Sequence, residues 1–216
     1  MSPRPYRLGQ RQATTEQTRA RILAATRELL MSNNGFSGFS IDAVARQADV
    51  ARMTVYYQFG SRIGLLEALC DYLAAQGGMD QLSHAFRQAD PLNALAEYIA
   101  VFGRFWNSDR LVTRRLRGLA ALDPDFEQVI RARDERRRQG LGVILQRLVE
   151  QHGPPAAAID EKVNVLYTLT SFETFDTLAG PTHSLEDVTS LVQQLARAVL
   201  GLSEDKGEKH VWNSPT

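Results

Sequence analysis

The segment RMTVYYQF, which begins at Arg52, gathers side chains that suit contact with duplex DNA. Arg52 carries a planar guanidinium that can donate two hydrogen bonds to the edge of a guanine, a contact that discriminates between bases by about 1–3 kcal/mol. Met53 and Thr54 could touch a thymine methyl or a phosphate, and the hydroxyls of Tyr56 and Tyr57 can bond to backbone oxygens. The alternative for either tyrosine is that it packs inside the protein. This chemistry requires one rigid element that presents the side chains together.

The residues on either side of this segment predict two short helices joined by a tight turn. Ser40 is a good N-cap for a first helix that begins at Ile41, and Asp49 tolerates the backbone conformations of a turn. The second helix begins near Arg52, and a supporting helix over 18–33 has apolar residues at intervals of three and four. Such a helix-turn-helix inserts its second helix into the major groove of DNA.

The stretch from about Thr18 to Leu73 resembles the N-terminal domain of the TetR family of transcriptional regulators. The resemblance is carried by TRARILAATRELL and by SIDAVARQADVARMTVYYQFGSRIGLLEAL, within which TVYYQFGSRIGLL is close to the family signature. It covers about a quarter of the chain. Two positions depart from the common pattern, since Asp49 stands where glycine is usual and Ala51 stands where serine or threonine usually caps the recognition helix. Loss of that cap costs about 1 kcal/mol of helix stability.

The resemblance adds residues to the predicted DNA-binding surface. Ser40 and Ile41, at the start of the preceding helix, are expected near the duplex, as is Gln58. Arg62 matches the family's phosphate-binding position. The complete predicted set is Ser40, Ile41, Arg52, Met53, Thr54, Tyr56, Tyr57, Gln58 and Arg62. Most of these contacts would position the protein on DNA rather than select its sequence.

The chain reads as helical, because no segment from 61 to 202 shows the two-residue alternation that strands require. We expect an all-α fold of about nine helices, with an N-terminal three-helix helix-turn-helix domain and, by resemblance, a C-terminal helical ligand-binding and dimerisation domain. The later helices are expected over 61–76, 90–106, 109–122, 123–151, 159–179 and 185–202. The expected domains are a flexible basic arm (1–15), the DNA-binding domain (16–62), the effector-binding and dimerisation domain (63–203) and a disordered tail (204–216).

The charge of the chain is divided between its two parts. The net formal charge is zero, but residues 1–62 hold nine arginines and four acidic residues, a formal charge of +5, which leaves −5 for the remainder. A basic head on an acidic body suits a protein that offers one end to a polyanion. The arginines of residues 1–15 could extend this contact into the minor groove, or the arm could be a solvated tail.

Several classes of function are not indicated. No nucleophile–base constellation, phosphate loop or metal-ligand spacing can be assembled, so we expect neither an enzyme nor a metal site nor a cofactor. The single cysteine, Cys70, excludes an internal disulfide framework and is expected to be buried filler in a reducing cytoplasm. No apolar stretch is long enough to span a membrane and no signal segment opens the chain, so a cytoplasmic location without a membrane partner is expected.

The segments 159–179 and 185–202 carry broad apolar stripes. These stripes could simply cover the core of the same chain. The TetR resemblance implies instead that the two helices pair with their copies in a homodimer. A dimer is also expected because a single recognition helix reads too few base pairs for tight specificity.

By the resemblance alone, the C-terminal body should hold a pocket for a small-molecule effector. The residues expected to bind it are Tyr98, Phe102, Phe105, Trp106, Tyr167, Phe172, Glu173 and Asp176. Aromatic residues at helical spacing are also typical of a plain core, and Glu173 and Asp176 could hydrogen-bond at a dimer seam. The arginine run over 131–138 could form a second anion-binding surface, but we interpret it as a solvated face with pairs such as Asp134 with Arg138.

These features together predict a DNA-binding transcriptional regulator. The resemblance implies a repressor that binds a palindromic operator on double-stranded DNA as a homodimer and is released by an unidentified small-molecule effector. The alternative is a chromosome-organising or protein-responsive factor with the same DNA-binding end, whose body docks a protein and binds no small ligand. A roomy apolar cavity would discriminate against that alternative.

Overall fold

The computed structural model describes residues 4–32, 38–152 and 159–202, and within these ranges the chain is helical and contains no strand. The all-α fold predicted from the sequence is confirmed, although these residues form eleven α-helices rather than about nine. The helices are α1 (Arg4–Met31), α2 (Ile41–Gln47), α3 (Arg52–Phe59), α4 (Arg62–Gln76), α5 (Leu82–Arg87), α6 (Pro91–Ser108), α7 (Arg110–Ala120), α8 (Pro124–His152), α9 (Ile159–Leu169), α10 (Phe172–Ala179) and α11 (Thr189–Val199), with one 3-10 turn, η1 (Met79–Gln81).

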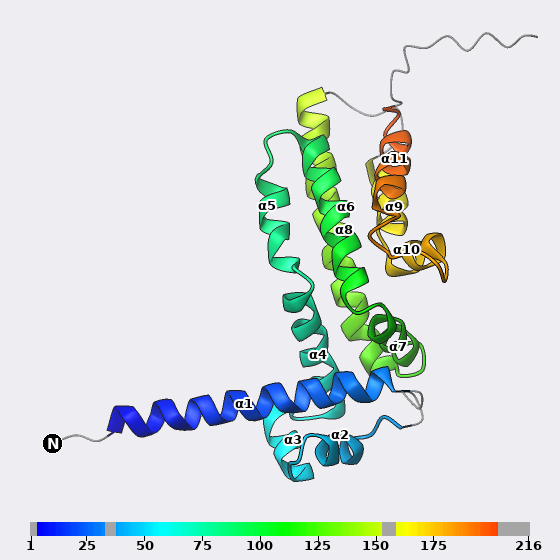
Figure 1. Cartoon of the computed structure of the whole chain (residues 1–216). Coiled ribbons are helices and arrows are strands. Elements are labelled where there is room, and N and C mark those ends of the chain that lie inside the picture. Colours follow the sequence, from blue (N-terminus) through cyan, green and yellow to red (C-terminus); the bar gives the residue numbers. More distant parts are fainter. Residues whose placement is uncertain (1–3, 33–37, 153–158, 203–216) are drawn as a thin grey trace, which may run out of the picture.

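The helices α1, α2 and α3 form a head at one end of the molecule (Figure 1). Their apolar faces meet in a core that includes Ile22, Val44 and Val55. The Oγ of Ser40 accepts a hydrogen bond from the backbone N–H of Ala43 at 3.1 Å, so the predicted N-cap of α2 is present. A local sequence signal therefore sets the start of α2.

The turn between α2 and α3 contains the two departures from the TetR pattern. Asp49 has a φ of 51°, and it is the one non-glycine residue with a positive φ in the described ranges. Glycine is favoured there because it has no Cβ to clash with the following carbonyl, and aspartate is among the few residues that tolerate the conformation. Ala51 is the N-cap of α3 and makes no side-chain cap bond.

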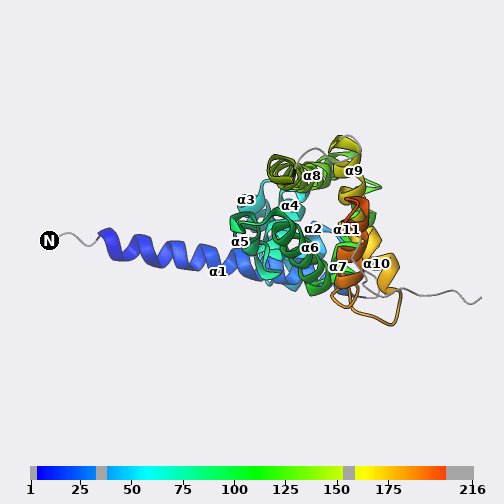
Figure 2. The same cartoon turned by 90° about the horizontal axis from the view of Figure 1, so that it is seen from above.

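The body consists of roughly parallel helices that extend away from the head (Figure 1). In Figure 1 the helices α6 and α8 lie between α5 on one side and α9, α10 and α11 on the other. The view from above also shows α5 and the α9–α11 group on opposite sides of α6 (Figure 2). A second core fills this layer with Tyr98, Leu141 and Phe175 among its fully buried side chains. The helix α4 runs from the head into the body, so the two parts share one continuous element.

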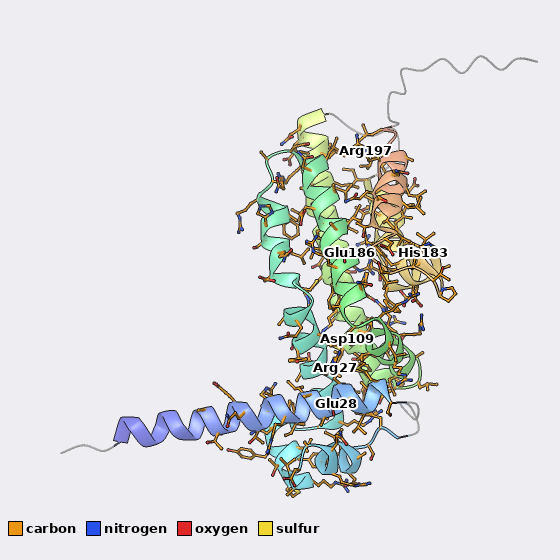
Figure 3. The ribbon with its side chains drawn as sticks, viewed as in Figure 1. Arg27, Glu28, Asp109, His183, Glu186 and Arg197 are labelled. Atoms are coloured by element: carbon orange, nitrogen blue, oxygen red, sulfur yellow. The ribbon has the colours of Figure 1, made fainter. Side chains whose placement is uncertain are left out.

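Ion pairs also tie the head to the body. The guanidinium of Arg27 on α1 donates two hydrogen bonds to the carboxylate of Asp109, at 2.6 and 3.0 Å (Figure 3). Arg115 of α7 donates to the backbone carbonyls of Leu30 and Ser32 at the end of α1. The core of the head continues into α7 and α8 through Val112, Leu116 and Phe126. A shift of α7 would therefore be transmitted to the head.

Three sequence expectations about helices differ from the structure. Residues 4–15 were expected to form a flexible arm, but α1 begins at Arg4 and is continuous to Met31. The helix expected over 159–179 is two helices, because the helical conformation is interrupted at Thr170. Ser171 then caps α10 by accepting a hydrogen bond from the N–H of Thr174. The turn η1 and the short helix α5 were not predicted.

The last helix also begins later than expected, at Thr189 rather than at 185. Ser184 and Asp187 cap each other across a turn, since each backbone N–H donates to the other's side chain. The tail expected over 204–216 lies outside the described residues. None of the described helices combines the length and apolar composition that crossing a membrane requires.

Candidate nucleic-acid interface and ligand cavity

The outer face of α3 presents the side chains that the sequence predicted for DNA. Tyr57 is 86% exposed and Met53 is 72% exposed, while Val55 on the opposite side is buried. Tyr56 is partly buried against the core of the head, so its ring packs while its hydroxyl stays available for hydrogen bonding. The packing alternative raised for the two tyrosines thus applies in part to Tyr56 and not to Tyr57.

Arg52 is exposed but already held by two neighbours. Its guanidinium lies 3.2 Å from the carboxylate of Asp42 on α2, and it donates to the hydroxyl of Tyr56 at 3.3 Å. With these contacts the guanidinium of Arg52 lies over the ring of Tyr56, and its central carbon is 5.6 Å from the ring centroid. To bond a base, Arg52 would have to exchange Asp42 for the base edge.

Two predicted DNA contacts, Ile41 and Arg62, are placed differently from the expectation. The side chain of Ile41 is 6% exposed in the core of the head, so only its backbone N–H could face a phosphate. Arg62 is half-buried, and its guanidinium bonds to the carboxylate of Asp123 at 2.6 Å and lies over the ring of Phe39. In this arrangement Arg62 joins α4 to the body and is not free for phosphate.

The remaining predicted residues lie at the edges of the same surface. Ser40 is exposed, although its hydroxyl caps α2, and Thr54 and Gln58 are half-buried. The backbone carbonyl of Gln58 accepts a hydrogen bond from Arg19 at 3.0 Å, and the Arg19 guanidinium lies 4.4 Å from the centre of the Phe59 ring. Arg19 therefore fixes α1 against the end of α3.

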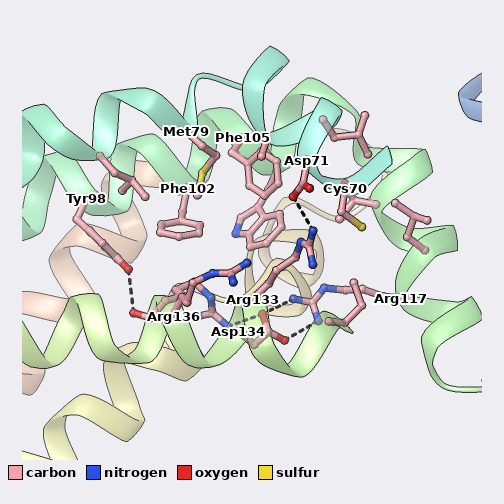
Figure 4. Close-up of a pocket in the computed structure, with 18 of the residues that line it drawn as sticks. Cys70, Asp71, Met79, Tyr98, Phe102, Phe105, Arg117, Arg133, Asp134 and Arg136 are labelled. Atoms are coloured by element: carbon pink, nitrogen blue, oxygen red, sulfur yellow. Dashed lines mark hydrogen bonds and ion pairs between the residues drawn. The ribbon is translucent and has the colours of Figure 1, made fainter. Parts of the chain in front are cut away.

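A cavity of about 290 Å³ lies in the body between α4, α6, α7 and α8, beside η1 and α5 (Figure 4). Four of the eight residues expected to bind a ligand line it, namely Tyr98, Phe102, Phe105 and Trp106. Its other lining residues are Cys70, Asp71, Leu73, Ala74, Met79, Leu82, Phe86, Thr113, Leu116, Arg117, Ile130, Arg133, Asp134, Arg136 and Arg137. The aromatic stretch of α6 is therefore both core and cavity wall.

Tyr167 and Phe172, also expected at the pocket, do not line the cavity. The ring of Phe172 is buried and packs edge-on against Trp106, with 5.8 Å between centroids. The ring of Tyr167 lies against the guanidinium of Arg137 at 4.2 Å. Both residues therefore lie behind the cavity wall and support it. The sequence spacing could not predict this, because it does not show which side of α6 and α8 the two residues would face.

Glu173 and Asp176 are likewise outside this cavity, and both pair with α7. Glu173 lies 3.2 Å from Arg117. Asp176 accepts hydrogen bonds from Arg110 at 2.6 Å and from Arg114 at 2.7 Å. Partial burial alone would raise the pKa of Asp176, but the bonds and charges of the two arginines outweigh it and lower the pKa.

The polar atoms of the aromatic wall are already bonded to the backbone. The hydroxyl of Tyr98 donates to the carbonyl of Arg137 at 2.8 Å, and the indole N–H of Trp106 donates to the carbonyl of Thr170 at 3.1 Å. Burial raises the pKa of Tyr98, and it raises the pKa of the Cys70 thiol to about 11. Cys70 is buried as expected, and its thiol is protonated near neutral pH.

The arginine run of α8 is not the fully solvated face that we expected. Arg131 fits the expectation, because it is exposed and pairs with Glu127 at 2.8 Å. Arg133 and Arg137, however, line the cavity, and Asp134 pairs with Arg137 and with Arg117 of α7 rather than with Arg138. Arg137 precedes the buried Leu141 by one helical turn, so the apolar stripe of the helix carried the signal that it faces inward.

Arg137 is 4% exposed and is the most buried charge of the cavity wall. Its Nη1 donates to the carbonyl of Tyr167 at 2.5 Å and to the hydroxyl of Thr170 at 2.8 Å, and its Nη2 donates to Asp134 at 3.3 Å. Its Nε has no hydrogen-bond partner within the described structure. Burial lowers the pKa of Arg137, and the nearby charge of Asp134 opposes that shift.

No group of three or more histidine, cysteine or acidic side chains that could hold a metal is found among the described residues. The charged side chains that line the cavity are arginines and aspartates. Such groups bind and orient a ligand by charge and hydrogen bonding.

Comparison with known proteins agrees with this geometry. Residues 22–69 match the family described as "Bacterial regulatory proteins, tetR family". The HTH-type transcriptional regulator AlkX of Mycobacterium tuberculosis is 32% identical over 122 residues, which are 55% of this chain and 56% of that protein. The match thus spans about half the length of this relative.

Solved structures extend the likeness to the whole fold. FadR from Bacillus subtilis, in complex with stearoyl-CoA, superposes with a TM-score of 0.63 at 17% identity, over 82% of this chain and 96% of that one. A putative transcriptional regulator from Saccharomonospora viridis, in complex with choline, also has a TM-score of 0.63 at 17% identity, over 82% and 94% of the two chains. The helix-turn-helix head, with its exposed face of α3, thus matches the tetR family of bacterial regulatory proteins, and the helical body shares the fold of the two solved regulators.

Proposed function

We propose that this protein is a transcriptional regulator that binds a palindromic operator as a homodimer, represses transcription, and is released from DNA by a small molecule. The observation that carries the proposal is that α4 connects the two candidate sites. It begins beside the exposed recognition helix and ends in the wall of the cavity. A ligand that moves α4 changes the position of the head.

The face of α3 is the proposed reader of the major groove. Arg52 contacts a base edge, Met53, Thr54 and Tyr57 contact methyl groups and phosphates, and Ser40, Tyr56 and Gln58 bond the backbone of the duplex. The exposure of Tyr57 and Met53 supports this assignment, since both side chains lie on the outer face of the helix that would enter the groove. Phosphate binding by Arg62 would require release from Asp123, and we place that step in the DNA-bound state.

The operator proposal is tested by selecting bound duplexes from a random pool. A dimer with one α3 in each half-site should enrich inverted repeats whose centres are about one helical turn apart, roughly 34–36 Å. Affinity should fall steeply as salt rises, because phosphate contacts release counterions. Enrichment of asymmetric sites, or of no sequence at all, would contradict the proposed mode of binding.

The proposed homodimer uses the layer formed by α9, α10 and α11. This layer lies on one side of the body (Figures 1 and 2). Four of its large apolar side chains are partly exposed to solvent. They are Val165 on α9, Leu178 on α10, and Leu191 and Leu195 on α11. A two-fold copy would bury them and supply the second recognition helix.

Sedimentation of a charged variant tests the dimer. Leu195→Glu should shift the protein toward the monomer, because it places a charge within an apolar contact. The matched control is Leu122→Glu, at an exposed leucine that lies between α7 and α8 and outside the helices of this layer. Equal sedimentation of the two variants, both as dimers, would exclude this layer as the interface.

The release step requires a ligand with different affinities for the DNA-bound and free states. The cavity supports a ligand-responsive regulator over a protein-responsive or chromosome-organising factor, because its volume of about 290 Å³ lies near the lower end of small-molecule sites. The fold alone does not choose the ligand, since the two solved neighbours are complexes with stearoyl-CoA and with choline. Fluorescence anisotropy of labelled operator during ligand titration tests release.

A further inference from the structure

The cavity has two chemically different sides (Figure 4). One side is formed by α6 and η1 and is apolar, with Met79, Phe102 and Phe105 facing the cavity. The polar atoms of the aromatic residues Tyr98 and Trp106 are bonded to backbone carbonyls, so they add little polarity to this side. A ligand in contact with it must therefore present apolar surface.

The opposite side is formed largely by α8 and carries positive charge. The ionisable side chains that line the cavity are four arginines, Arg117, Arg133, Arg136 and Arg137, and two aspartates, Asp71 and Asp134. These residues leave a formal excess of two positive charges, counted before the thiol and phenol, which are neutral. Glu67 and Glu173 pair with Arg133 and Arg117 but do not line the cavity, and more than half of each of their side chains is exposed.

Two of the four arginines have pairings that are already complete. Arg133 lies 2.6 Å from Asp71, with Glu67 at 3.7 Å. Arg117 lies 2.9 Å from Asp134, with Glu173 at 3.2 Å. The excess charge therefore resides on the other two arginines.

Arg136 and Arg137 are the arginines with unmet bonding capacity. Arg136 is exposed at the cavity and makes no hydrogen bond or ion pair with any described residue. Arg137 shares Asp134 with Arg117, and its buried Nε has no partner. An anion placed between these two guanidinium groups would bond the free donors of Arg136 and add a second counter-charge beside Arg137.

We propose that the ligand of this cavity is an anionic amphiphile, whose apolar chain lies against the aromatic side and whose carboxylate or phosphate lies at Arg136 and Arg137. The proposal rests on the proposed function only in treating the cavity as the effector site. A guanidinium recognises both carboxylate and phosphate through paired hydrogen bonds, so a free fatty acid and an acyl thioester of coenzyme A share the required chemistry. A cationic ligand would meet an uncompensated positive wall.

Isothermal titration calorimetry on the full chain tests the charge of the ligand with probes of equal chain length. The probes are decanoate, decanoyl-coenzyme A, the neutral decanol and the cationic decyltrimethylammonium. We expect decanoate or its thioester to bind at least about tenfold more tightly than decanol, which corresponds to the strength of one hydrogen bond to a charged group. Whichever of the two anions binds more tightly shows whether the ligand is a free fatty acid or a thioester of coenzyme A. Equal binding of all probes, or preference for the cation, would overturn the proposal.

Substitution of Arg136 tests the position of the head group. Arg136→Gln should weaken the preferred anion about tenfold and leave decanol unchanged, since this arginine has no structural partner to lose. Arg131→Gln is the matched control on the same helix, because Arg131 is exposed and does not line the cavity. Arg136→Glu should lose the anion and gain the cation. An equal response of Arg136→Gln and Arg131→Gln would exclude this binding position.

Anisotropy with labelled operator separates this proposal from the proposed function. If the anion binds with the expected charge pattern but leaves operator affinity unchanged, the ligand class stands and the release mechanism is wrong. If only neutral or cationic compounds bind the cavity and release the operator, the ligand class is wrong and the release mechanism stands.

Discussion

The buried pair of Asp134 and Arg137 allows a quantitative test of the charged wall. The two side chains lie 3.3 Å apart, but they depend on each other unequally. Asp134 is the one carboxylate that pairs with Arg137 in the described structure, whereas Asp134 also pairs with Arg117 at 2.9 Å. We therefore predict that removing the carboxylate destabilises the protein more than removing the guanidinium.

The loss in the free energy of unfolding depends on which buried groups each substitution leaves without a partner. Asp134→Leu leaves the guanidinium of Arg137, which is 4% exposed, without a counter-charge, and such a loss costs about 3–5 kcal/mol. Arg137→Met removes the buried charge together with its desolvation penalty. It removes the closer donor to the carbonyl of Tyr167, at a cost of about 1–3 kcal/mol, and leaves that carbonyl the longer contact with the hydroxyl of Thr170 at 3.3 Å. A net cost of about 1 kcal/mol is expected for Arg137→Met, since relief of desolvation offsets part of the loss.

Urea unfolding followed by circular dichroism measures these costs, at one protein concentration because a dimer's stability depends on it. The double variant Asp134→Leu/Arg137→Met should be more stable than Asp134→Leu by about 2 kcal/mol, since it no longer buries an unpaired charge. If Arg137→Met costs as much as Asp134→Leu, or if the double variant is the least stable of the three, Asp134 does not stabilise Arg137 and the charge accounting of the cavity is wrong.

Three further predictions concern other parts of the molecule. Asp49→Gly should raise the free energy of unfolding by about 1 kcal/mol, because its φ of 51° strains an L-residue, and urea unfolding would show no gain if that strain is absent. Asp42→Asn should strengthen binding to all DNA sequences in anisotropy assays, since it frees Arg52 and removes a charge that repels phosphate; weaker binding would contradict this. The lowered pKa of Asp176 means that its stabilisation is lost as pH falls below about 4, so acidic melting curves of Asp176→Asn should fall less steeply than those of the wild type.

The head of the molecule could be predicted from sequence because its signals are local. Ser40 caps α2 and Ser61 caps α4, each by accepting a hydrogen bond from a backbone N–H three residues later. Gly60 ends α3 with a φ of 72°. Capping and turn propensities act within a few residues, so these bounds do not depend on the rest of the fold. The exposure of Tyr57 followed from the same helical spacing.

The break between α9 and α10 depends on contacts from distant segments. The sequence over 159–179 has no glycine or proline, and helical periodicity continues through it. The structure ends α9 where Arg137 and Trp106 donate hydrogen bonds to the carbonyls of Tyr167 and Thr170. These donors satisfy carbonyl groups that a continued helix would otherwise use, so the break costs little.

The sequence by itself determined that a helix-turn-helix head precedes a helical body, because caps, turn residues and apolar spacing are properties of short segments. Only the tertiary structure decided which charges face inward. Arg131 and Arg137 are chemically identical and lie on one helix, yet one is solvated and the other is buried against α6 and α9. A buried charge is stable only where distant segments supply its partners, and those partners are fixed by the packing of the whole chain.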